Sequence, residues 1–220
     1  CEHPVSMQLF GSEPDLMADV AKSIEDRNFD ILDINMGCPV PKVVNNGEGS
    51  ALLKSPDLIE EIVRKVSSAI SKPVTVKVRI GFENAPVDIV EIAKRVEDAG
   101  AAAIAVHGRT RQQYYSGTAD WDTIRRVKEA VTIPIIGNGD VDSPLKAEAL
   151  MKQTGCDAVM VGRAVRGNPW LFRELNHYFR TGELMERPST EEIREMILRH
   201  ARKQIELKGE FVGIREMRKH

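Results

Sequence analysis

The feature that most constrains this sequence is a regular alternation between short apolar runs and longer segments with helical spacing. Between the runs, apolar residues recur three and four positions apart, as from Leu58 to Val66 and from Ile89 to Val96. This alternation of strand and helix favours a parallel sheet. The runs expected to form strands are Val5–Phe10, Ile31–Met36, Val74–Ile80, Ala103–Val106, Ile133–Ile136 and Ala158–Val161.

An internal repeat favours a barrel among the parallel-sheet folds. GAAAIAVHG (Gly100–Gly108) and GCDAVMVGR (Gly155–Arg163) both begin with a glycine that can end a helix, and both continue into a strand. A doubly wound sheet is the weaker alternative, because the GxGxxG fingerprint after the first strand is absent. We therefore expect a TIM-like (β/α)8 barrel over residues 1–187, with six of the eight units in this sequence and two before it.

Composition narrows the function only broadly. A formal net charge of −2 over 220 residues gives no overall electrostatic reason to expect nucleic acid. No apolar stretch reaches the roughly 18 residues of a membrane span, and no signal peptide pattern is present, so we expect a cytoplasmic protein. The cysteines, Cys1, Cys38 and Cys156, are far apart in the sequence, so neither a disulfide framework nor a metal site is expected.

Polar residues follow the predicted strands, at the end where barrels of this kind carry their chemistry. Lys77 and Arg79 lie two apart and so face the same side of a strand. A charged edge strand is one explanation, but a strand covered by helices would need an anionic partner such as a cofactor. The strand-end candidates are Gln8, Asn35, Cys38, Lys77, Arg79, His107, Arg109, Asn138, Gly139, Asp140, Gly162 and Arg163.

Two of these groups have a more specific interpretation. Cys38 could be a small buried apolar residue, but its place on a loop stiffened by Pro39 and Pro41 favours a functional thiol. The glycine-containing turns at 138–140 and 162–163 follow the last two strands, where many barrels bind phosphate. A single phosphate pocket without a dinucleotide fingerprint fits FMN better than FAD, although a simple turn is the alternative for each glycine.

Several segments together resemble the bacterial tRNA-dihydrouridine synthases, most closely the B-type, and the resemblance covers nearly the whole chain. It implies an FMN-dependent barrel that reduces particular uridines of tRNA to 5,6-dihydrouridine with NADPH as electron donor. The segments are MQLFG (Met7–Gly11), DINMGCPVPKV (Asp33–Val43), GEGSALL (Gly47–Leu53), VKVRIG (Val76–Gly81), VHGRTRQQYYSGTADW (Val106–Trp121), IIGNGDV (Ile135–Val141) and GRAVRGNPWLF (Gly162–Phe172).

The resemblance also implies roles for single residues. Cys38 would donate a proton to uracil C5 while a hydride reaches C6, and an ordinary thiol is protonated at neutral pH and can do so. Gly37 would let this loop approach the flavin and the base, and Asp140 would bond a ribityl hydroxyl or a backbone N–H. The residues expected to bind FMN are Gln8, Lys77, His107, Asn138, Gly139, Asp140, Gly162 and Arg163. The residues expected to contact the base or the tRNA are Asn35, Arg79, Lys42 and Arg109.

After about Arg187 the pattern becomes purely helical. Ser189 to Glu192 fits a capping box, and an apolar stripe from Ile193 to Ala201 lies opposite basic residues. The resemblance makes residues 188–220 the start of a helical tRNA-binding domain, whereas an ordinary amphipathic helix is the alternative. It also implies missing segments at both ends, so we expect a fragment. A small-molecule flavin reductase of the dihydropyrimidine kind and a non-catalytic RNA-binding product are the alternative functions.

Overall fold

The structure is a computed structural model that describes residues 3–83 and 87–218. The chain forms two compact units. The first contains the residues up to Val141 together with Lys146–Val161, and the second contains Asp142–Leu145 together with the residues from Gly162 onward. The expected limit of the barrel at residue 187 stays a prediction.

The first unit contains one parallel sheet with helices between its strands. The strands are β1 (Ser6–Leu9), β2 (Ile31–Met36), β3 (Val74–Gly81), β4 (Ala103–Thr110), β5 (Ile135–Asn138) and β6 (Ala158–Met160). The helices that follow them are α1 (Pro14–Ile24), α2 (Pro41–Val44), the 3-10 helix η1 (Gly49–Lys54), α3 (Pro56–Ala69), α4 (Ile89–Asp98), α5 (Trp121–Ala130) and α6 (Pro144–Thr154), of which the part from Lys146 onward belongs to this unit.

The order of the strands identifies the type of sheet. All six strands are parallel, and they are hydrogen-bonded in the order β1-β2-β3-β4-β5-β6. A doubly wound sheet would reverse direction at a switch point, and this sheet does not. The strands therefore form one continuous wall of a TIM-like barrel, as the repeat predicted.

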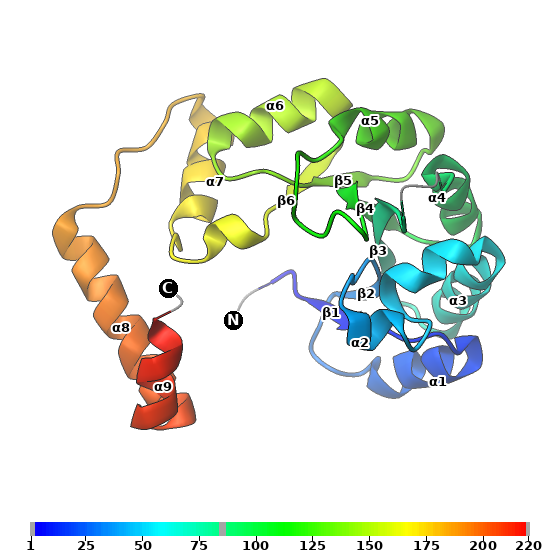
Figure 1. The fold of residues 1–220 in the computed structure, drawn as a ribbon, viewed down its shortest axis with the longest axis horizontal. Coiled ribbons are helices and arrows are strands. Elements are labelled where there is room, and N and C mark those ends of the chain that lie inside the picture. The colour runs from blue at the N-terminus through cyan, green and yellow to red at the C-terminus, as the bar shows by residue number, and fades with distance from the viewer. Residues whose placement is uncertain (1–2, 84–86, 219–220) are drawn as a thin grey trace. The chain divides into compact units, whose positions relative to one another are not determined.

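The sheet has one apolar face and one polar face. Figure 1 shows α1, α3, α4 and α5 following one another along one side of the strands. The side chains of Leu32, Ile34 and Val76, which are fully buried, point to this side. Because successive side chains of a strand alternate, Asp33, Asn35, Thr75, Lys77, Arg79 and His107 point to the opposite side.

Proline and glycine fix the ends of the helices. Pro14 and Pro56 occupy the first turn of α1 and α3, where a missing N–H costs nothing. Gly100 (φ 98°) and Gly155 (φ 68°) follow α4 and α6 in the left-handed region that favours glycine. Both glycines of the internal repeat therefore end a helix just before a strand, as expected from the sequence.

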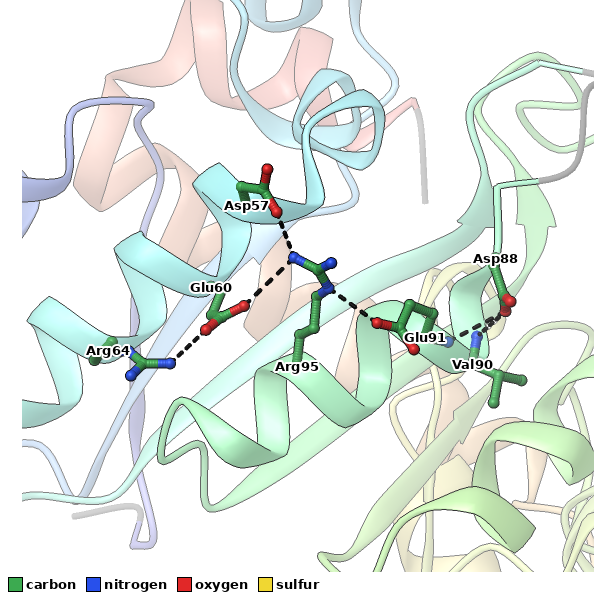
Figure 2. A network of polar contacts seen from close by, with 7 residues as sticks. All are labelled: Asp57, Glu60, Arg64, Asp88, Val90, Glu91 and Arg95. Atoms are coloured by element: carbon green, nitrogen blue, oxygen red, sulfur yellow. Dashed lines mark hydrogen bonds and ion pairs between the residues drawn. The ribbon is translucent and has the colours of Figure 1, made fainter.

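A surface network joins α3 to α4, shown in Figure 2. Arg95 of α4 contacts Asp57 and Glu60 of α3 and also donates to its neighbour Glu91. At the start of the same helix, the Asp88 carboxylate accepts the N–H groups of Val90 (3.1 Å) and Glu91 (3.2 Å). Exposed ion pairs contribute little to stability, whereas the cap satisfies N–H groups that have no partner in the helix.

The second unit is helical. Its elements are η2 (Arg163–Val165), α7 (Leu171–Thr181), α8 (Thr190–Lys208) and α9 (Glu210–Met217). The capping box predicted at Ser189 and Glu192 is present. Gly213 lets α9 approach α8, because an added Cβ would lie 2.9 Å from the backbone of Gln204. Within residues 3–83 and 87–218, no helix combines the length and hydropathy needed to cross a membrane.

We expect Asp88→Ala to lower the free energy of unfolding by about 1 kcal/mol, because it removes the side-chain cap of α4. Asp57→Ala is the matched control, since it deletes an exposed carboxylate of the same network and should cost less than about 0.5 kcal/mol. Urea denaturation of the two variants measures the difference. Equal losses in both would mean that the cap stabilises α4 no more than an exposed ion pair does.

Candidate active site

The polar face of the sheet begins with a chain of hydrogen bonds across β1, β2 and β3. Gln8 donates to one oxygen of Asp33 (2.6 Å), and Thr75 donates to the other (2.7 Å). Asn35 in turn donates its amide to Gln8 Oε1 (2.8 Å). Burial raises the pKa of Asp33, while the bonds from Gln8 and Thr75 oppose that rise. Asp33 and Thr75 were not candidates, although their position two residues before Asn35 and Lys77 places them on the same face.

The loop that carries Cys38 is held by its backbone. Asn35 Oδ1 accepts the N–H groups of Gly37 (3.1 Å) and Cys38 (2.9 Å). Ser50 donates to the Cys38 carbonyl from its N–H (3.1 Å) and its hydroxyl (2.9 Å). The thiol of Cys38 is free and half-buried, and it lies on a loop just beyond β2, the position expected for it. Cys156, by contrast, is buried before β6, where packing explains it.

Arg79 joins this loop to the segment after β4. Its side chain is buried, and Nε donates to the Gly37 carbonyl (2.9 Å). Nη1 donates to the carbonyls of Thr110 (2.9 Å) and Tyr114 (3.0 Å). Burial lowers the pKa of the Arg79 guanidinium from its ordinary value. The guanidinium therefore fixes two loops relative to one another, a role that the sequence did not indicate.

The structure gives a different reason for Gly37 than the one expected. A Cβ added at Gly37 would lie 3.3 Å from the Lys77 carbonyl oxygen and 3.3 Å from the Val78 carbonyl carbon. The loop thus makes its close approach to the backbone of β3. This contact alone favours glycine, whether or not a ligand lies on the other side.

Lys77 points into the polar face from the middle of β3. Its Nζ donates to Asn138 Oδ1 (3.0 Å), and the Asn138 amide donates to the Met160 carbonyl (2.8 Å). Among the described residues, no carboxylate is hydrogen-bonded to Nζ. Burial, with a smaller contribution from the nearby charge of Arg79, lowers the pKa of Lys77 to about 8. The site therefore contains a partly desolvated cation that an anionic group would stabilise.

His107 lies beside this cation, within β4. The residue is 8% exposed. Burial lowers its pKa to about 3, helped by the charges of Lys77 and Arg79, so the imidazole is neutral at physiological pH. Gly139 packs against it, because a Cβ there would lie 3.2 Å from His107 Cδ2 and 2.6 Å from the Cβ of Ala119. With φ at 128°, Gly139 could not be replaced without strain.

Arg109 does not fit the expected contact with tRNA. Its side chain is only 2% exposed and forms an ion pair with Asp140 (2.7 Å). It also donates to the carbonyls of Ser116 (3.0 Å) and Gly117 (2.6 Å). The Asp140 carboxylate accepts the Ala119 N–H (2.7 Å), one of the two partners expected for it. These bonds fix the loop after β4 and offset part of the desolvation of the Arg109 charge. Its Nη1, which is also buried, has no hydrogen-bond partner among the described residues.

The remaining candidates lie at the surface. Lys42 is exposed on α2. Gly162 and Arg163 are exposed in the second unit, so their expected pairing with the turn at Asn138 stays a prediction. Within the described parts of the chain, no group of three or more His, Cys, Asp and Glu residues could hold a metal ion.

We expect His107→Asn to make stability less sensitive to acid. The unfolded histidine takes up a proton near pH 6.5 and the folded one only near pH 3, so in the wild type stability falls as pH drops through this window. Asparagine has no such proton. Between pH 6.5 and 5 the variant should lose about 2 kcal/mol less than the wild type, by urea denaturation. If both proteins lost the same amount of stability over this range, His107 would take up its proton as readily in the folded as in the unfolded protein.

Comparison with known proteins shows which family the chain belongs to. The dihydrouridine synthase (Dus) family model matches residues 1–220. tRNA-dihydrouridine synthase B of Vibrio parahaemolyticus is 46% identical over 215 residues, which are 98% of this chain and 67% of that protein. The proteins of the same name from Pseudomonas putida and Pseudomonas aeruginosa are 45% and 44% identical, over 99% and 100% of this chain and 64% and 66% of their own. The chain thus spans about two thirds of the length of these relatives, and it belongs to the dihydrouridine synthase family.

Proposed function

We propose that the protein reduces uridines of tRNA to 5,6-dihydrouridine, with FMN as cofactor and NADPH as electron donor. The observation that carries this proposal is the placement of Cys38. A free thiol, half-buried and held by its backbone, stands at the edge of a polar face that contains the cation of Lys77. The family and the name of the relatives supply the substrate.

The polar face suits a flavin. Lys77 bonds one neutral amide, so its ammonium can still donate to an anionic ring edge. A reduced flavin carries negative charge at N1 and O2, where a cation stabilises it. His107, neutral and adjacent, adds no competing charge. We assign the ring to Gln8, Lys77 and His107. The phosphate would be held by Asn138, Gly139, Asp140, Gly162 and Arg163, with Asp140 contributing its backbone because its carboxylate is paired with Arg109.

The bound FMN would supply the hydride that uracil receives at C6. The chain itself supplies the proton: the S–H bond of Cys38 breaks, a C–H bond forms at C5, and the C5=C6 double bond becomes single. Because Cys38 is only half-buried, solvent can return a proton to its sulfur afterwards. NADPH would restore the cofactor for the next turnover.

Two side chains keep donors for the base. Asn35 uses one N–H of its amide for Gln8, which leaves the second for a uracil carbonyl. The bonds of Arg79 use Nε and Nη1, so the Nη2 group is the part of this residue that we assign to the base. The target uridine has to leave its stacked position to reach such a site. Lys42, which is exposed, is our candidate for a contact with a tRNA phosphate. Because the proposed substrate is tRNA, we expect the protein to work in the cytoplasm.

One observation favours the small-molecule alternative. Several basic residues of the helical unit are engaged with acidic neighbours, namely Arg194 with Glu191, Lys203 with Glu206 and Lys208 with Glu216. Their charges are partly compensated, so electrostatic attraction to RNA is weaker than their number indicates. Assays with unmodified tRNA and with free uracil separate the two functions. Turnover of free uracil alone would refute tRNA as the substrate.

We expect Cys38→Ala to retain bound FMN and to lose nearly all uridine reduction, because the proton donor is gone. Dihydrouridine in tRNA, measured by mass spectrometry, and flavin absorbance provide the two readouts. Cys156→Ala is the matched control and should keep its activity, since that thiol is buried before β6. Full turnover by the Cys38 variant would exclude the thiol as the acid.

We expect Lys77→Met to stabilise the flavin-free protein while weakening FMN binding. The pKa of Lys77 in the folded protein is about 8, below the ordinary 10.5. At pH 7 the folded protein therefore holds a desolvated charge that lowers its stability, and this penalty disappears only as pH rises from 8 to 10.5. Methionine should add about 2 kcal/mol at pH 7 by urea denaturation, and FMN affinity should fall at least about tenfold.

Lys152→Met, which removes an exposed lysine of α6, is the control for both measurements and should change neither appreciably. A Lys77 variant that is less stable at pH 7 than the wild type would show that the ammonium is well solvated in the fold.

A further inference from the structure

The segment GEGSALL (Gly47–Leu53) contacts Cys38 directly, although none of its residues is assigned to the flavin or the base. Ser50 is fully buried. Both of its donors converge on one acceptor, because its N–H (3.1 Å) and its hydroxyl (2.9 Å) bond the Cys38 carbonyl. The hydroxyl does not cap η1, whose N-cap residue is Glu48. Ser50 thus directs its side chain to the cysteine rather than to its own helix.

Gly49, the residue before Ser50, also packs closely against Cys38. It has φ at 58°, in the region that favours glycine. An added Cβ would lie 2.9 Å from the Cys38 carbonyl oxygen and 3.0 Å from the Cys38 Cβ. No larger residue fits between this turn and the cysteine unless the cysteine moves. The position of the turn and the position of Cys38 therefore depend on one another.

The opposite side of the cysteine backbone is also held. Asn35 Oδ1 accepts the Cys38 N–H (2.9 Å), so both backbone polar groups of this residue are bonded. With its backbone fixed at both groups, the thiol can move mainly by rotation about one side-chain bond. A proton donor works only when it lies within hydrogen-bond reach of the reacting carbon, so such restraint matters to the rate.

We propose that Ser50, packed through Gly49, is a positioning residue that holds the Cys38 thiol in line with the reacting base. This inference rests on the proposed function. It concerns only the step in which Cys38 gives up its proton, because Ser50 reaches neither the polar face nor any residue that we assign to the flavin. The reduction of bound FMN by NADPH needs no proton from Cys38.

Ser50→Ala tests the proposal with two readouts. Amide hydrogen exchange over residues 37–50 should quicken about fivefold, because one of two bonds to the Cys38 carbonyl is lost. Stopped-flow absorbance should show tRNA-dependent oxidation of the flavin slowed about tenfold, with flavin reduction by NADPH and FMN affinity unchanged. Gly49→Ala keeps both Ser50 donors but displaces Cys38, so it should give the same pattern.

Thr154→Val is the matched control. Thr154 is 2% exposed, and its hydroxyl donates to the Leu150 carbonyl (2.8 Å) and accepts the N–H of the other buried cysteine, Cys156 (3.1 Å). Its loss should leave exchange at residues 37–50 and both flavin steps unchanged.

Different failures have different meanings. Unchanged exchange at residues 37–50 in Ser50→Ala overturns the positioning role, whatever the protein catalyses. Equal slowing of both flavin steps, or loss of FMN, also overturns it, because the residue would then support the fold as a whole. A wild-type protein that exchanges as expected but never oxidises its flavin with tRNA refutes the proposed function, and the exchange result alone then decides whether Ser50 restrains Cys38.

Discussion

The chemistry of this protein depends on the register of a parallel sheet whose two faces carry opposite kinds of side chain. Leu32, Ile34 and Val76 point to the helices, while Asp33, Asn35 and Lys77 alternate with them and point away. A shift of one residue in any strand would exchange the two faces, bringing charge against the helices. The burial of the apolar face therefore fixes the polar face, and the same free energy that folds the sheet aligns the site.

Above the sheet, backbone carbonyls are held by buried guanidinium groups. Arg79 donates to three carbonyls of two loops, and Arg109 donates to two carbonyls and to Asp140. A buried arginine is costly unless its donors are bonded, and its planar fork can reach several acceptors at once. Loops without regular hydrogen bonds of their own are thereby given defined positions.

The site holds a charged lysine that burial disfavours beside a histidine that burial keeps neutral. Lys77 has a pKa lowered to about 8, and that of His107 is lowered to about 3. Desolvation is the first cause for both, and the cluster of cations adds to it. Such perturbation is common where a protein binds an anion or moves a proton, because the cost is recovered when the ligand arrives. Burial of the apolar face stabilises the fold and offsets the desolvation of these polar groups.

The sequence by itself determined the order of strands and helices and the direction in which most side chains point. Strand β2 was predicted with its observed bounds, and the spacing of Lys77 and Arg79 placed both on one face. Cys38 was expected on a loop beyond its strand and lies there. These features depend on local periodicity, proline and glycine, which act within a few residues.

Only the tertiary structure decided which polar groups meet. Strand β4 extends to Thr110 and includes Arg109. The side chain of Arg109 is buried and forms an ion pair with Asp140, although the sequence led us to expect a contact with tRNA. Ser50 meets Cys38, 12 residues away in sequence, and Lys77 meets Asn138, 61 residues away. A side chain's periodicity gives its face but not its partner, because the partner depends on how loops close between distant strands. The sequence was thus enough to predict which face of the sheet carries the site, whereas the packing of the sheet and its loops determined which hydrogen bonds form there.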